Sequence, residues 1–139
     1  MIRPRSLQNL FLSGMLALPA QAAPKAFDPA KDIDISLHHG VLSLKVPKEV
    51  HLKQRFLKVE AKAGVVTLGE LPPASGKDEV GDPVWRGTVH VALHGQDLKD
   101  PVELRVTYQP CSEGVGGVCY RPQHHALVVR AADFEPAAK

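Results

Sequence analysis

The residues of this chain best suited to chemistry are its two cysteines, Cys111 and Cys119. Seven residues separate them, Ser-Glu-Gly-Val-Gly-Gly-Val, and the chain has no third cysteine. The glycines of this gap, Gly114, Gly116 and Gly117, allow the backbone to adapt to both a dithiol and a disulfide. A bridge in such a loop is also one that an attacking thiolate can reach, which exchange requires. The spacing therefore favours a reversible, redox-active disulfide.

A structural disulfide is the alternative interpretation. The bridge of an immunoglobulin-type domain joins two sheets through cysteines far apart in the sequence, whereas this one closes a short loop. By the chain-entropy argument, a short loop gains less stability from a bridge than a long one. A passive immunoglobulin-like interaction module remains open, and it predicts a disulfide that resists mild reductants.

The first 22 residues have the features of a secretory signal peptide. Arg3 and Arg5 precede an apolar stretch at 10–18, and Ala20-Gln21-Ala22 fits a cleavage site. The stretch is shorter than the roughly 20 residues that span a bilayer, so we expect no membrane insertion. We expect cleavage after Ala22, a single domain over 23–139, and a periplasmic location in which disulfides persist.

The net charge of +2 comes from those two arginines, so the secreted part is near neutral. A neutral chain without a basic cluster argues against binding to nucleic acid or to an anionic membrane surface.

Alternating apolar and polar residues predict short strands along most of the chain. The expected strands cover 32–37, 42–46, 56–61, 64–68, 84–93, 102–108 and 126–130, with a turn at His38-His39-Gly40. Prolines lie at their edges, where a missing N–H does least harm. This pattern predicts an all-β, antiparallel β-sandwich. We expect a long Pro/Gly-rich loop at 71–83 and a frayed tail from Ala131.

These elements place the cysteines around one hairpin connection, between the strands at 102–108 and 126–130. Antiparallel neighbours have Cα atoms about 4.5–5.5 Å apart, which suits a disulfide.

The flanks of the cysteines, TYQPC at 107–111 and CYRP at 119–122, resemble the N-terminal periplasmic domain of the thiol:disulfide interchange protein DsbD. The runs VWRGTVHVAL and LSLKVPKEVHLKQRFLKV extend the resemblance over roughly 32–130. It implies an immunoglobulin-like fold and a protein-disulfide reductase activity with no cofactor besides the disulfide. It also implies that Cys119 forms the mixed disulfide with a partner and that Cys111 resolves it.

The resemblance further implies partners. Electrons come from a membrane-linked thioredoxin-like donor and pass to periplasmic thioredoxin-fold proteins, such as disulfide isomerases and the cytochrome c maturation reductase. The 139 residues include no membrane or thioredoxin-like domain, so we expect that the chain receives electrons from separate proteins or is a stand-alone relative with another client. We also expect a monomer.

Further site residues follow from the same resemblance. His51 and Lys53 share one face of a short strand, at positions where the family has active-site aromatics. A cation there would favour a thiolate, and a solvated strand face is the plain alternative. Tyr108 and Tyr120 belong to the cysteine flanks.

The loop that shields the cysteines in that family corresponds to the segment containing Asp78, Glu79 and Val80. Val80 is the apolar side chain of this segment where the family has an aromatic. Trp85 and Tyr120 are the aromatic residues available to take that place. The loop between the cysteines is also longer than the family's pattern.

Seven histidines raise a third possibility, a periplasmic copper or zinc site built from the thiols and a histidine. The adjacent pairs His38-His39 and His124-His125 are poor chelators, because neighbours on a strand point to opposite faces. We therefore assign no metal ligands.

Overall fold

Alternating apolar and polar side chains form antiparallel strands along the described chain, as predicted. The computed structural model describes residues 27–114 and 117–136, and the expected signal peptide lies outside this part. The strands are β1 (Asp34–His38), β2 (Val41–Lys45), β3 (Val50–Lys53), β4 (Lys58–Ala61), β5 (Val66–Leu68), β6 (Gly76–Lys77), β7 (Pro83–Trp85), β8 (Thr88–Gly95), β9 (Val102–Tyr108), β10 (Pro110–Ser112) and β11 (Gln123–Val129). Short 3₁₀ turns lie at Gln54–Phe56, Lys62–Gly64 and Ala131–Phe134, and the described residues contain no α-helix.

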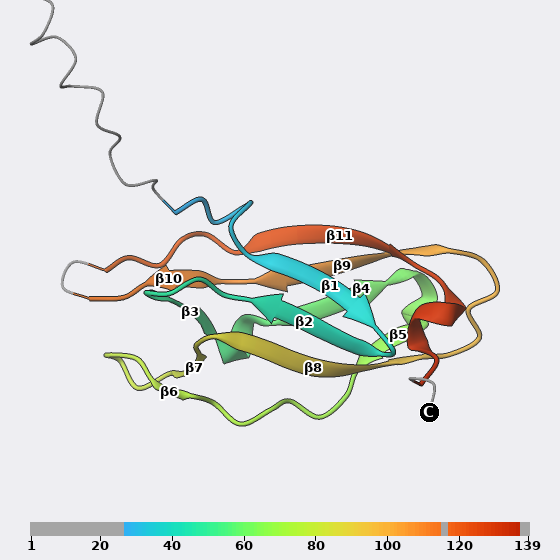
Figure 1. Cartoon of the computed structure of the whole chain (residues 1–139), viewed down its shortest axis with the longest axis horizontal. Coiled ribbons are helices and arrows are strands. Elements are labelled where there is room, and N and C mark those ends of the chain that lie inside the picture. Colours follow the sequence, from blue (N-terminus) through green and yellow to red (C-terminus); the bar gives the residue numbers. More distant parts are fainter. Residues whose placement is uncertain (1–26, 115–116, 137–139) are drawn as a thin grey trace, which may run out of the picture.

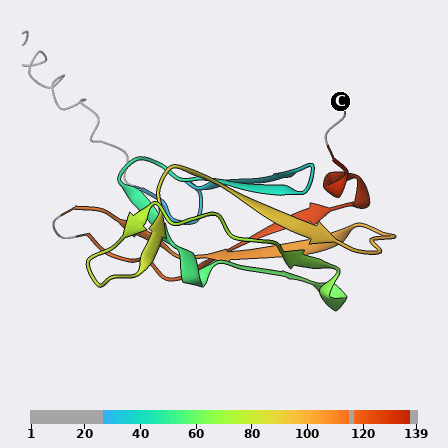
Figure 2. The ribbon, with the colours of Figure 1, turned by 90° about the horizontal axis from the view of Figure 1, so that it is seen from below.

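The strands form three antiparallel sheets with the orders β1-β2-β8-β5, β11-β9-β4 and β10-β3-β7-β6. The first two face each other as the layers of a sandwich, and the third lies at one end (Figures 1 and 2). Leu42 and Val91 from one layer and Leu104 and Val106 from the other share one buried core. The predicted all-β, immunoglobulin-like sandwich is confirmed.

The predicted strand over 84–93 is wrong in one respect, because it is two strands in different sheets. β7 pairs with β3, whereas β8 pairs with β2 and β5. The break is at Arg86-Gly87, where Gly87 has a φ of +74° that side-chain-bearing residues rarely adopt. Because apolar residues continue on both sides of the break, alternation alone does not reveal it.

The other predicted boundaries shift slightly. The turn at His39 and Gly40 has positive φ at both residues, as a two-residue hairpin requires. Strand β11 begins earlier than expected, and β6 lies inside the segment expected to be a plain loop. The tail expected to fray instead forms a 3₁₀ turn at Ala131–Phe134, in which the Asp133 carbonyl accepts a hydrogen bond from Gly40 N.

The third sheet carries both cysteine-bearing and loop-bearing strands to the same end of the sandwich (Figure 1). β10 continues from β9 but pairs with β3, and β3 in turn pairs with β7, which follows the loop at 78–82. Val50 and Leu52 of β3 point into the core, so His51 and Lys53 point to the opposite face. This face is the candidate site.

Candidate functional site

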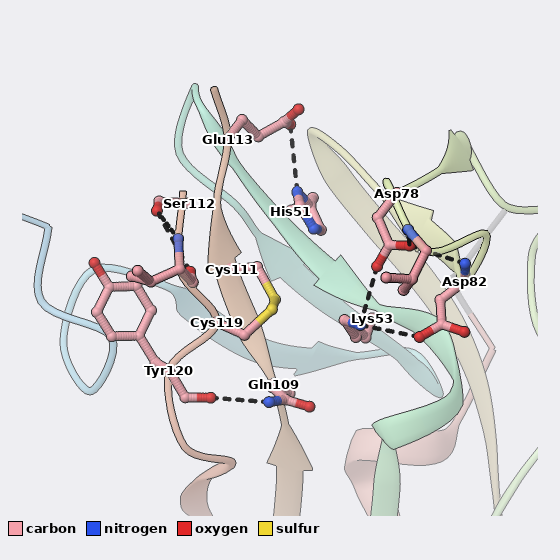
Figure 3. The surroundings of a disulfide bond; sticks show 12 residues. His51, Lys53, Asp78, Asp82, Gln109, Cys111, Ser112, Glu113, Cys119 and Tyr120 are labelled. Atoms are coloured by element: carbon pink, nitrogen blue, oxygen red, sulfur yellow. Dashed lines mark hydrogen bonds and ion pairs between the residues drawn. A yellow bond between two sulfur atoms is a disulfide. The ribbon is translucent and has the colours of Figure 1, made fainter. Parts of the chain in front are cut away.

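Cys111 and Cys119 form a disulfide across an isolated antiparallel bridge (Figure 3). Their Cα atoms are 3.9 Å apart, which is closer than the predicted range. Cys111 belongs to β10, and Cys119 lies on the returning segment that leads to β11. The prediction that both cysteines flank one hairpin connection is confirmed.

The two cysteines differ in their access to solvent. Cys111 is 1% exposed, whereas Cys119 belongs to the exposed residues of the chain. An incoming thiolate must approach a sulfur in line with the S–S bond. Cys119 is therefore the cysteine that a partner can reach.

Hydrogen bonds hold the segments beside the cysteines together. Ser112 N donates to the Val118 carbonyl at 2.8 Å, and Tyr120 N donates to the Pro110 carbonyl at 2.9 Å. Glycine is required at Gly117, because a Cβ there would collide with the Ser112 carbonyl oxygen. Gly114 has a φ of +96°, so it too uses a conformation that glycine favours.

His51 lies directly opposite Cys111 in the pairing of β3 with β10. Side chains that face each other in this way have Cβ atoms about 4.5–5.5 Å apart. The His51 side chain is 8% exposed, and its Nδ1 lies 3.7 Å from Glu113 Oε2. The alternative of a solvated strand face is therefore wrong at His51, which is buried beside the disulfide.

Lys53 ties the strand β3 to the loop that precedes β7. Its Nζ lies 3.0 Å from Asp78 Oδ2 and 2.9 Å from Asp82 Oδ2. Asp78 Oδ1 in turn accepts hydrogen bonds from the backbone N–H groups of Val80 and Asp82, at 3.0 and 2.9 Å. The loop is thus closed both onto itself and onto β3 (Figure 3).

This charge pairing determines the ionisation of the cluster. Hydrogen bonds from Lys53 to Asp82 and Asp78 raise the pKa of Lys53 above its ordinary value. Burial raises the pKa of Asp78, but hydrogen bonds from Lys53, Asp82 N and Val80 N outweigh it and leave that pKa lowered. Lys53 is therefore a paired ammonium. The carboxylates of Asp78 and Asp82 compensate its positive charge, so little of that charge acts on the disulfide.

A cavity of about 220 Å³ lies beside the disulfide, and most of the predicted site residues line it. The predicted residues that line it are Cys111, Cys119, His51, Lys53, Asp78, Glu79 and Val80. No Phe, Tyr or Trp side chain is among the lining residues of the described chain. Val80 is 76% exposed and leaves Cys119 open to solvent.

The predicted aromatic residues lie elsewhere. Trp85 is buried in the core, and its indole N–H donates to the Pro72 carbonyl. Tyr120 packs on Phe27 with ring centroids 5.4 Å apart, on the side of Cys119 away from Lys53 and Asp78 (Figure 3). Neither residue covers the disulfide.

Tyr108 is a core residue rather than a neighbour of the sulfur atoms. It is 1% exposed, and its hydroxyl donates to the Pro29 carbonyl at 3.1 Å. Burial, together with the charge of Asp28, raises the pKa of Tyr108. Tyr108 thus packs in the core, although it is close to Cys111 in the sequence.

Glu113 and Arg86 are site residues that the sequence reasoning missed. Arg86 Nε lies 2.6 Å from Glu113 Oε2, and this hydrogen bond lowers the pKa of Glu113. A signal existed for Glu113, because it is two residues after Cys111, the spacing at which side chains of an extended segment share a face. Nothing in the sequence indicated Arg86, because its place depends on the break between β7 and β8.

The described part of the structure shows no ligand set for the alternative of a copper or zinc site. Within residues 27–114 and 117–136, no three His, Cys, Asp or Glu side chains are grouped so that they could hold an ion. His124, from one of the adjacent pairs, has its Nδ1 2.9 Å from Thr107 Oγ1.

Comparisons with known proteins identify the family of the chain. The profile of the family described as "Thiol:disulfide interchange protein DsbD, N-terminal" matches residues 17–131. The DsbD N-terminal domain of Neisseria meningitidis in its reduced form is similar in structure, with a TM-score of 0.61, 18% identity, and coverage of 80% of this chain and 94% of that one. No curated protein matches the sequence.

A second similar structure is the complex between the DsbD N-terminal and the PilB N-terminal domains from Neisseria meningitidis. Its TM-score is 0.57 at 22% identity, with coverage of 76% of this chain and 88% of that one. At these identities the two structures show a common fold.

Proposed function

Because the chain belongs to the family of DsbD N-terminal thiol:disulfide interchange domains, we propose that it relays reducing equivalents through Cys111 and Cys119, with Cys119 as the partner-facing thiol. The observation that carries the assignment of roles is the contrast in burial, since Cys119 is exposed and Cys111 is 1% exposed. Cys111 is then the resolving thiol. We place the domain among the protein-disulfide reductases.

The exchange balances as two substitutions at sulfur. In the reduced domain, the Cys119 thiolate attacks one sulfur of a partner's disulfide and releases the other as a thiolate, giving a mixed disulfide. The Cys111 thiol loses its proton, attacks Cys119 Sγ, and expels the partner's second thiolate, which takes up a proton. The partner gains two electrons and the domain regains its disulfide. Reduction of the domain by a donor dithiol runs through the same steps in reverse.

The partner that we propose is a thioredoxin-fold protein, either a client or a membrane-linked donor. The complex of the Neisseria DsbD N-terminal domain with a PilB domain supports a folded protein partner. In this chain, Val80 and Val118 are 76% and 53% exposed and line the cavity beside Cys119. Apolar side chains at the rim of a reactive sulfur suit transient docking of another protein.

The setting that we propose is the periplasm. It rests on the predicted signal peptide at 1–22 and on the family, with 23–139 as one monomeric domain that works without an organic cofactor. In the part of the chain that the structure describes, no helix has the length and apolar character to cross a bilayer.

Trapping with single-cysteine variants tests this function. Cys111→Ala leaves the exposed thiol without a resolving partner, so we expect it to accumulate a mixed disulfide with a thioredoxin-fold protein, detected on non-reducing gels. Cys119→Ala is the matched control, because its remaining thiol is buried and is expected to trap little. Equal trapping by both variants would contradict the assigned roles.

The rate at which the wild-type disulfide is reduced distinguishes a relay from a passive interaction module. A relay disulfide exchanges with a reduced thioredoxin-like protein within a short incubation. A disulfide that persists under these conditions, together with no trapped species from either variant, would indicate the passive interaction module.

A further inference from the structure

The side chain of His51 is a buried titratable group for which the exchange steps above give no role. It is 8% exposed, and within the described residues neither Nδ1 nor Nε2 has a hydrogen-bond partner. Buried polar atoms are nearly always paired, and an exception calls for an explanation such as a part in chemistry. The unpaired ring lies on the lining of the disulfide cavity.

From this arrangement we infer that His51 is the proton acceptor for the Cys111 thiol, an inference that rests on the proposed relay. His51 and Cys111 are directly paired across β3 and β10 and project to the same face. Figure 3 shows His51 beside Cys111, between Glu113 and the loop that carries Asp78. The geometry assigns the ring to the resolving cysteine.

Cys111 needs an internal base more than Cys119 does. Burial disfavours a thiolate, and Cys111 is 1% exposed, so water is a poor acceptor for its proton. Cys119 is exposed and can lose its proton to solvent. The resolving attack is therefore the step in which an imidazole is useful.

Charged side chains lie around His51 in the cavity. Glu113 Oε2 lies 3.7 Å from His51 Nδ1, and the hydrogen bond from Arg86 keeps this carboxylate ionised. The other charged groups lining the cavity are Lys53, Lys77, Asp78, Glu79 and Arg86. Of these, Lys53 is paired with Asp78 and Asp82, and Arg86 is paired with Glu113 through a 2.6 Å hydrogen bond from its Nε.

The proton then has a complete path. In the mixed disulfide, the Cys111 thiol passes its proton to His51 as the sulfur attacks Cys119 Sγ, and the partner's thiolate leaves. The imidazolium returns the proton to the leaving thiolate or to solvent. When a donor thiol instead attacks Cys119 Sγ of the oxidised domain, its proton passes to His51 directly or through solvent, Cys111 leaves as a thiolate, and the imidazolium protonates it.

A two-step reaction with dithiobis(nitrobenzoate) tests the inference on the reduced protein. The first coloured thiolate is released when Cys119 attacks the reagent, and the second is released when Cys111 resolves the mixed disulfide. We expect His51→Gln to slow the second release at neutral pH by at least about tenfold, since general acid–base groups typically contribute 10²-fold or more. The first release should keep its wild-type rate, which also shows that the variant is folded.

The pH profile provides a readout that a purely structural role would not move. The wild-type second step should accelerate as pH rises through the imidazole range, about pH 5–8. The His51→Gln rate should rise only with ionisation of a thiol and should meet the wild-type rate at alkaline pH.

His90→Gln is the matched control, since His90 lies exposed on β8 and contacts Ser43 rather than the disulfide. It should match the wild type in both steps. An unchanged second step in His51→Gln would overturn the inference about His51 while leaving the relay intact. A wild-type protein that releases one thiolate and never the second would instead overturn the relay itself.

Discussion

Lys53 of β3 and Asp78 of the loop before β7 form an ion pair with 3.0 Å between Nζ and Oδ2. Both side chains are largely buried, at 13% and 10% exposure. Asp78 also accepts two hydrogen bonds from its own loop, so one carboxylate fixes the shape of the loop and its attachment to the strand. Lys53 is therefore the residue of β3 that ties this loop to the strand beside the disulfide.

Lys53→Met should release this loop without unfolding the sandwich. The methionine retains much of the apolar stem but leaves Asp78 and Asp82 without their cation. We expect amide hydrogen exchange at Val80 and Asp82 to accelerate by about tenfold or more, because local opening becomes easier. Arg55→Met is the control, since Arg55 is 61% exposed and reaches Asp82 only at 3.8 Å. Similar exchange in both variants would show that Lys53 does not hold the loop.

The stability of the oxidised protein should fall in acid. Folding lowers the pKa of Glu113 from its ordinary 4.5 and that of Asp78 from 3.8, so the unfolded chain binds protons more readily than the folded one. The contribution of these groups is complete above about pH 4.5 and is lost as pH falls through their lowered folded values. Thermal unfolding against pH measures this loss.

Glu113→Gln should flatten the acid part of that curve, because the residue can no longer titrate. Glu103→Gln, on the exposed face of β9, should leave the curve as in the wild type. A Glu113→Gln curve with the full wild-type slope below pH 4.5 would mean that its pairing with Arg86 does not contribute to folding.

Val80→Phe should partly shield the disulfide. Val80 lines the cavity yet is 76% exposed, and a phenyl ring at this position has the size to cover Cys119. We expect reduction by dithiothreitol to slow several-fold, because access limits thiol–disulfide exchange. Val128→Phe is the control, since Val128 is also exposed but belongs to β11. Equal reduction rates in the two variants would exclude shielding by this loop position.

The strands were largely predictable because burial on one face imposes alternation, as in β1, β2 and β9. Alternation does not say which sheet a strand joins. The break at Gly87 and the pairing of β10 with β3 depend on contacts between distant segments. Glycine inside a strand pattern was the one local signal of the break.

The site was predictable to the extent that the cysteines and their neighbours in sequence define it. The shared face of His51 and Lys53 followed from strand periodicity. Their different surroundings did not, because Lys53 is paired by carboxylates from a loop, whereas His51 is buried opposite Cys111. Tyr108 shows the opposite error, since closeness to Cys111 in sequence did not place it at the site.

Tyr108→Phe should therefore affect stability and not exchange. It removes a hydroxyl that donates to the Pro29 carbonyl, a loss worth about 1 kcal/mol of unfolding free energy. The rate of disulfide reduction should stay at the wild-type value. Tyr120→Phe is the control and should change neither quantity. If disulfide reduction is slower in Tyr108→Phe, the tyrosine hydroxyl contributes to exchange and the prediction is wrong.

Gly117→Ala should destabilise the oxidised protein more than the reduced one. A Cβ at this position meets the Ser112 carbonyl oxygen, and the disulfide holds the two segments together so that they cannot separate. Overpacking of this kind costs about 1–3 kcal/mol, and the dithiol form can relieve it by moving the loop. By linkage, the equilibrium with glutathione should shift toward the dithiol by roughly tenfold for each 1.4 kcal/mol of that difference. Gly76→Ala is the control, because its added Cβ meets only the movable end of Arg86. Equal destabilisation of the oxidised and reduced forms by Gly117→Ala would show that the disulfide does not enforce the contact.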